Sequence, residues 1–176
     1  MSRTFSVLSL LACLTAAMAA GTEASGPARP GPVVVDVRGR VAGGYGMGPW
    51  VSYGVEPEVL VLWPGGHGIG LDLGYGIVNG AGGAMSVASV GVKYAAVRLR
   101  SPGPLAAKSG AGASLLLDSN GRIGARVRLE AGFALLATRR MAFPVEAIVT
   151  GEVYGSGGAA LMVGLSLGAG WVFAGR

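Results

Sequence analysis

The chain has 176 residues, of which 51% are hydrophobic, only 13% are charged and 33 are glycine. A soluble domain usually carries about 25% charged residues, and this chain has two lysines, two asparagines and no glutamine. It therefore lacks the long polar side chains that cover a soluble protein. Its net charge of +5 is spread along the sequence without a basic run, which argues against nucleic acid as a partner.

The N-terminus has the three parts of a secretory signal peptide. Arg3 precedes an uncharged, mostly apolar stretch at residues 5–14, and Ala17-Met18-Ala19 forms a small-x-small cleavage pattern. The apolar stretch is shorter than the ~20 residues that a membrane-spanning helix needs. We therefore assign residues 1–19 to a signal peptide. Cleavage there removes Cys13, the only cysteine, so the mature chain has no disulfide and no thiolate metal ligand.

Residues 20–32 are predicted to be a flexible lead-in, because this stretch is rich in glycine, proline and alanine and has no large apolar side chain. From residue 33 onward, apolar residues alternate with small or polar residues at a period of two, which is typical of half-buried strands. We predict eight strands, and one domain that spans residues 33–176. The predicted strands lie at residues 33–45, 51–63, 69–77, 88–96, 105–117, 123–135, 145–153 and 161–173.

Most of the intervals between these segments contain turn-forming residues, such as Asn79-Gly80 and Asp118-Ser119-Asn120-Gly121. The exception is residues 138–143, where two arginines mark the break instead. Pro57 lies inside a predicted strand and lacks the N–H that a strand ladder needs, so we expect a β-bulge there.

The two faces of the strands differ in a way that decides which is in contact with water. The apolar face has no charge in the middle of any strand, and Arg98 and Arg100 lie only at a strand end. The other face is mostly glycine, alanine and serine, with seven acids and six bases whose charges nearly cancel. Such a face suits a lumen in which each buried charge has a partner. The predicted lumen charge network comprises Asp36, Arg38, Arg40, Glu56, Glu58, Asp72, Lys93, Lys108, Arg126, Arg128, Glu130, Glu146 and Glu152.

The sequence thus predicts an all-β fold: a single closed antiparallel transmembrane β-barrel with eight strands in up-and-down order. Aromatic residues near strand ends fit the girdles of such barrels at the two membrane interfaces. The predicted interfacial aromatics are Tyr45, Trp50, Tyr53, Trp63, Phe143, Trp171 and Phe173. Tyr75 and Phe133 do not follow this pattern.

One competing signal is residues 157–175, which are uncharged and long enough to be a membrane-spanning helix. Gly164 and Gly168 have the GxxxG spacing of helix packing faces. However, six of the nineteen residues are glycine, and the large apolar residues alternate with small ones between Val163 and Leu167. We therefore favour a strand.

The chain resembles the small eight-stranded outer-membrane barrels of Gram-negative bacteria, the OmpA/OmpX-like class. The resemblance covers residues 33–176 and includes the final Gly168-Ala169-Gly170-Trp171-Val172-Phe173, which is similar to the aromatic C-terminal strand of that class. It implies an outer-membrane location and recognition by the outer-membrane assembly machinery. Two features depart from the class: Ala174-Gly175-Arg176 follow the last aromatic residue, and all the connections are short.

The leading functional hypothesis is a structural or general outer-membrane protein with a side-chain-filled lumen and no catalysis. Three alternatives are a narrow ion or small-solute channel, a soluble lipocalin-like carrier and a membrane-embedded lipid hydrolase. A hydrolase needs a base beside its nucleophile, and the one histidine, His67, lies in a turn without a nearby serine. Glu56 and Glu58 are interpreted as ion-pair partners of Arg126 or Arg128 rather than as paired catalytic carboxylates or a cation site. We expect membrane lipid as a partner, no cofactor and no metal.

Overall fold

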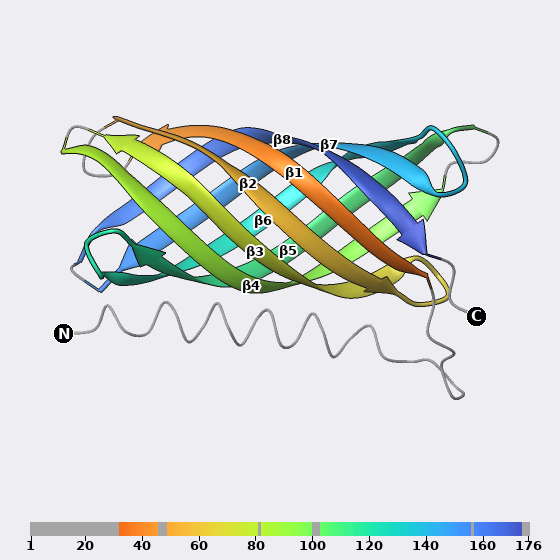
Figure 1. Cartoon of the computed structure of the whole chain (residues 1–176), viewed down its shortest axis with the longest axis horizontal. Helices are drawn as coiled ribbons and strands as arrows, with labels where there is room; N and C mark the ends of the chain where they lie inside the picture. The colour runs from red at the N-terminus through yellow and green to blue at the C-terminus, as the bar shows by residue number, and fades with distance from the viewer. Residues whose placement is uncertain (1–31, 46–48, 81, 100–102, 156, 174–176) are drawn as a thin grey trace.

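The computed structural model describes residues 32–45, 49–80, 82–99, 103–155 and 157–173. These residues form eight β-strands that are joined in chain order into one barrel (Figure 1). The strands are β1 (Val33–Tyr45), β2 (Pro49–Leu62), β3 (His67–Gly80), β4 (Gly83–Leu99), β5 (Leu105–Asp118), β6 (Ile123–Leu136), β7 (Met141–Tyr154) and β8 (Ala159–Phe173). In the described parts of the chain, no helix has the length and apolar character needed to cross a membrane.

Each strand pairs antiparallel with the next, and β1 closes the barrel by pairing with β8. The closing ladder runs without interruption from Val33 opposite Phe173 to Tyr45 opposite Leu161. Closure matters because an open sheet edge would leave a row of unpaired backbone N–H and C=O groups, which hydrocarbon cannot satisfy. The predicted closed, up-and-down eight-stranded barrel is confirmed.

The alternation of apolar with small or polar residues along each strand separates the outer face of the barrel from its inner face. Large apolar side chains cover the outer surface and are exposed, among them Leu71 (60%), Leu129 (56%) and Leu165 (59%). The alternate residues point into the lumen and are buried. Residues 159–173 form β8 and not a helix, as the alternation between Val163 and Leu167 predicts.

Glycine is required where neighbouring strands approach closely at the β1–β8 seam. A Cβ atom on Gly164 would lie 2.2 Å from the carbonyl oxygen of Val41 and 2.5 Å from the Cα of Ala42. Any larger residue at this position would push β8 away from β1. The many glycines on the inner face therefore reflect close backbone approach as well as room for long side chains.

The bulge predicted at Pro57 is absent, and that prediction is wrong. Pro57 pairs in register with Val37 of β1. On its other side the ladder has a gap, but Val55 opposite Tyr75 and Glu58 opposite Asp72 keep the same register across it. Pro57 therefore interrupts the β2–β3 ladder without adding a residue, because the regular pairs on both sides hold the two strands in line.

The two ends of the lumen are apolar, and its middle is charged. We call the end with the β1–β2, β3–β4, β5–β6 and β7–β8 connections the hairpin end, and the end where β1 begins and β8 finishes the terminal end (Figure 1). At the hairpin end, Val78, Met85, Val87, Leu116 and Tyr154 form a buried cluster. At the terminal end, smaller clusters form around Leu60 and Leu62, and around Ala106, Ala134 and Ala142.

Replacing Leu129 in the middle of β6 with arginine is expected to lower the free energy of unfolding in lipid vesicles by about 2–4 kcal/mol, because it places a charge on the outer face at mid-strand. The same change at Ile123, the first residue of β6 and 67% exposed, is the matched control. Its expected cost is about 0–1 kcal/mol, because the charge lies near the interface. Urea titration followed by tryptophan fluorescence measures both; equal costs would contradict a hydrocarbon layer around the middle of the barrel.

Candidate functional site

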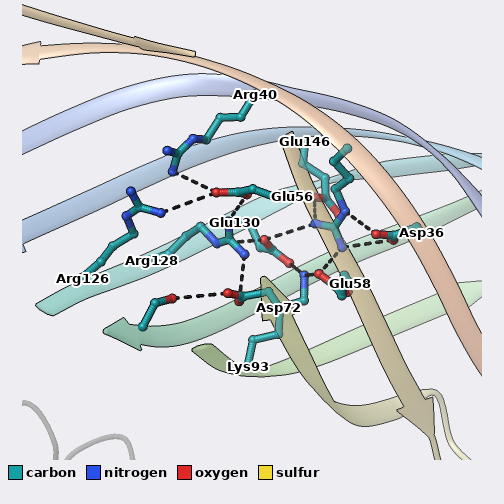
Figure 2. Close-up of polar contacts among 12 residues, drawn as sticks. Asp36, Arg40, Glu56, Glu58, Asp72, Lys93, Arg126, Arg128, Glu130 and Glu146 are labelled. Atoms are coloured by element: carbon teal, nitrogen blue, oxygen red, sulfur yellow. Dashed lines mark hydrogen bonds and ion pairs between the residues drawn. The ribbon is translucent and has the colours of Figure 1, made fainter. Parts of the chain in front are cut away.

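The thirteen charged residues predicted for the lumen all lie inside the barrel, and each is at most 6% exposed. They come from seven strands, β1 to β7, and meet in the central part of the lumen. Figure 2 shows a large part of this network. The eighth strand, β8, has no charged residue, and its small inward-facing residues leave space in the lumen. A Cβ atom on its Gly168 would lie 2.7 Å from Cγ of Arg38, and one on Gly170 would lie 2.9 Å from Cβ of Asp36. Small residues on β8 thus make room for the long side chains of β1.

Arg38 is the hub of the half of the network that lies toward the terminal end. Its Nε donates to Oδ1 of Asp36 at 2.9 Å, and its Nη1 donates to Oε2 of Glu146 at 2.6 Å. It also forms ion pairs with Glu58 and, at 3.5 Å, with Glu130. One guanidinium therefore joins carboxylates from β1, β2, β6 and β7, and ties together strands that are not neighbours in the sheet.

The two lysines complete this half. Nζ of Lys93 on β4 forms ion pairs with Glu58 and Glu130. Nζ of Lys108 on β5 lies 3.0 Å from Glu146, 3.6 Å from Asp36 and 3.7 Å from Glu58. Each carboxylate of this half therefore faces at least two cations, which offsets much of the cost of removing it from water.

Glu56 is the centre of the other half, toward the hairpin end. It lies between Arg40, Arg126 and Arg128 (Figure 2), with contacts of 3.1 Å to Arg40 and 3.5 Å to Arg126 and an ion pair with Arg128. Arg126 also donates to Glu152 at 2.7 Å.

Arg128 connects the two halves of the network. It lies 3.2 Å from Asp72 and 3.5 Å from Glu130. The expectation that Glu56 pairs with Arg126 or Arg128 thus agrees with the geometry. For Glu58 the same expectation is wrong, since Glu58 pairs with Arg38, Lys93 and Lys108. Glu58 lies two residues after Glu56 on β2, closer to the terminal end, and therefore belongs to the half of the network around Arg38.

An additional buried acid, Asp118, is not among the predicted lumen charges, because it lies within a predicted turn. It is 4% exposed, accepts hydrogen bonds from the backbone N–H groups of Asn120 and Arg122 at 2.9 Å, and pairs with the Arg122 side chain at 2.6 Å. An aspartate that begins an Asp-Ser-Asn-Gly turn commonly accepts such backbone N–H groups. That signal could have identified it as a turn-stabilising residue.

Six of the seven predicted girdle aromatics are exposed on the outside: Tyr45, Tyr53, Trp63, Phe143, Trp171 and Phe173. The assignment of Trp50 to the girdle is wrong. Trp50 shares the lumen side of β2 with Ser52 and packs against the buried cluster around Met85 and Tyr154 at the hairpin end. The period of two that places Tyr53 outside therefore places Trp50 inside.

His67, expected in a turn, is the first residue of β3 and lies on the outside of the barrel. Its ring stacks on that of Tyr94, with centroids 5.8 Å apart and an interplanar angle of 22°, and the Tyr94 hydroxyl shares a hydrogen bond with its Nδ1.

Among the described residues, no group of three or more His, Cys, Asp or Glu side chains could hold a metal ion. The lumen carboxylates face basic side chains, so the arrangement neutralises charge and fills space.

Replacing Arg38 with methionine is expected to lower the free energy of unfolding by about 3–5 kcal/mol, because removing one partner of a buried network leaves its carboxylates uncompensated. The matched control is Arg122→Met, since Arg122 is 40% exposed and Asp118 keeps its two backbone donors. Its expected cost is below about 1 kcal/mol. Urea titration in vesicles gives both values, and a small cost for Arg38→Met would mean that the network does not support the barrel.

No protein-family model and no curated protein sequence matches this chain. Solved structures do match it. Neisserial surface protein A is 12% identical, with 80% of this chain and 98% of that chain covered and a TM-score of 0.66. Ail, the attachment invasion locus protein of Yersinia pestis, is 11% identical, with 81% and 99% covered and a TM-score of 0.52. The chain therefore has the fold of the small eight-stranded outer-membrane β-barrels.

Proposed function

We propose that this chain is a general structural protein of the Gram-negative outer membrane, with a closed, charge-paired lumen and no catalytic activity. The observation that carries the proposal is the filling of the lumen. Eight strands leave an interior just wide enough for side chains to fill, and thirteen charged side chains cross it in mutual contact.

Within the network and between it and the hairpin end, the spaces that remain are small. One of about 10 Å³ lies between Arg40, Glu56 and Arg126, and another of about 30 Å³ lies beside Trp50 and Met162 at the hairpin end. A single water needs about 10–15 Å³, so these spaces hold at most a few waters. A lumen with this packing supports a barrel that blocks ions and solutes.

The outer surface supports membrane lipid as the partner. Leucine, valine and isoleucine side chains are exposed around the whole barrel, and such a surface is stable only when hydrocarbon covers it. The outer-membrane location rests on the shared fold together with the signal peptide assigned to residues 1–19. In this proposal the even strand number places both termini of the barrel on the periplasmic side, and β8, which ends in Trp171-Val172-Phe173, is the strand that the assembly machinery recognises.

The purified barrel in a planar bilayer is expected to show no steady conductance, because the network obstructs the lumen. A wide porin measured in the same bilayer is the positive control, since barrels of 16–18 strands leave an aqueous channel. Steps of fixed size from this protein, with an ion selectivity that changes in Arg126→Gln, would replace the proposal with a narrow channel.

Membrane extracts are expected to contain the protein, and its migration on a denaturing gel is expected to change on boiling, because a closed barrel resists detergent until heated. The Leu129→Arg variant is run on the same gel for comparison. The gel band of its folded barrel is expected to disappear at a lower temperature than that of the wild-type chain. Recovery of the wild-type chain in the soluble periplasmic fraction would instead favour a lipocalin-like carrier.

A further inference from the structure

The terminal end of the lumen contains a cavity of about 370 Å³ that the ion-pair network does not fill. It extends from the connections at that end down to Asp36 and Lys108, the first charged residues of the network. Its size lies within the ~300–1,000 Å³ range of small-molecule sites, which are concave, mostly apolar and carry a few polar groups.

The wall of the cavity is apolar although it lies on the lumen side of the strands. Its apolar lining includes Val34, Leu60, Leu62, Ala106, Ala134 and Ala142. Seven strands contribute to this wall: β1, β2, β4, β5, β6, β7 and β8. Because such a wall is unfavourable in water, an acyl chain placed against it is stabilised by the hydrophobic effect.

Charge differs between the floor and the mouth of this cavity. At the floor, Lys108 is surrounded by the carboxylates of Glu146, Asp36 and Glu58. At the mouth, Thr138 and the exposed Arg139 line the opening. Within the described residues Arg139 forms no ion pair. The charge of Lys108 at the floor is therefore already compensated by carboxylates, whereas Arg139 attracts an anionic group to the mouth.

We propose that this cavity binds a single-chain anionic amphiphile, with its acyl chain against the apolar wall and its acidic headgroup at Arg139. The polar floor at Asp36 and Lys108 limits how far the acyl chain extends. This binding is separate from the proposed structural role, because it needs neither an open lumen nor a moving part.

The mature chain in phosphatidylcholine nanodiscs is suited to the test, since a detergent would compete for the cavity. Trp50→Phe and Trp171→Phe leave Trp63, which lines the mouth, as the single tryptophan. Dodecanoate brominated at carbon 2 places the bromine beside the headgroup and is expected to quench Trp63 in a saturable way. Dodecanoate brominated at carbon 12 places the bromine deeper in the cavity, farther from the mouth, and is expected to quench Trp63 much less. Unlabelled dodecanoate should reverse the quenching.

Two pairs of variants separate the cavity from the surrounding bilayer. Ala134→Phe fills the cavity and is expected to weaken binding at least about tenfold, whereas Leu135→Phe, its outward-facing neighbour, should leave binding unchanged. Arg139→Gln removes the headgroup contact and is expected to weaken binding about tenfold. Arg140→Gln removes an equal charge beside the cavity without lining it, and should have little effect. Heat-modifiable migration verifies that each variant is folded.

Several outcomes would overturn the proposal. Quenching that rises linearly with the amphiphile and is equal in Ala134→Phe and Leu135→Phe would mean partition into the bilayer only. Equal affinity for dodecyltrimethylammonium would exclude recognition of an anion. Binding by a chain that begins at Pro32, but not by the mature chain, would show that the cavity is occupied by the protein's own N-terminal segment. None of these outcomes bears on the conductance test, so the two proposals fail independently.

Discussion

The pairing of buried charges across the lumen is the constraint on which the rest of this barrel depends. This barrel has no single hydrophobic core, because most of its large apolar side chains point outward and the buried ones form separate clusters. What holds opposite walls together is the network around Arg38 and Glu56, in which β1 reaches β2, β6 and β7 through side chains. Each of these ions is costly alone and tolerable only with its partners in place. The thirteen residues therefore behave as one unit.

The sequence composition follows from that constraint. Long charged side chains from seven strands fit in a narrow lumen only if the inward-facing side chains of the eighth strand are small beside them. There β8 presents Gly164, Ser166, Gly168 and Gly170 to the interior. The same glycines allow β1 and β8 to approach closely at the seam that closes the barrel. Packing inside and closure of the sheet are thus served by the same residues.

The lumen is divided along its axis into layers with different physical character. The hairpin end is packed with large apolar side chains, the middle is an ion-pair network, and the terminal end is apolar and encloses a cavity that the described residues leave open. In the proposed function, this asymmetry distinguishes an obstructed barrel from a continuous channel. It also allows one protein to combine a charge-filled middle with a cavity of ligand size.

The sequence alone determined the number of strands and the thirteen charges inside, because side chains alternate between the two faces of a strand and the composition of each face shows which one is inside. It also contained a sign of the terminal-end cavity, since Val59-Leu60-Val61-Leu62 is apolar on both faces. Only the tertiary structure decided which charges meet, why Glu58 belongs with Arg38 and not Arg128, why Pro57 needs no bulge, and which buried cluster Trp50 packs against. These features depend on contacts across the lumen and on the register held by neighbouring strands, and a closed barrel brings together residues that no local pattern connects.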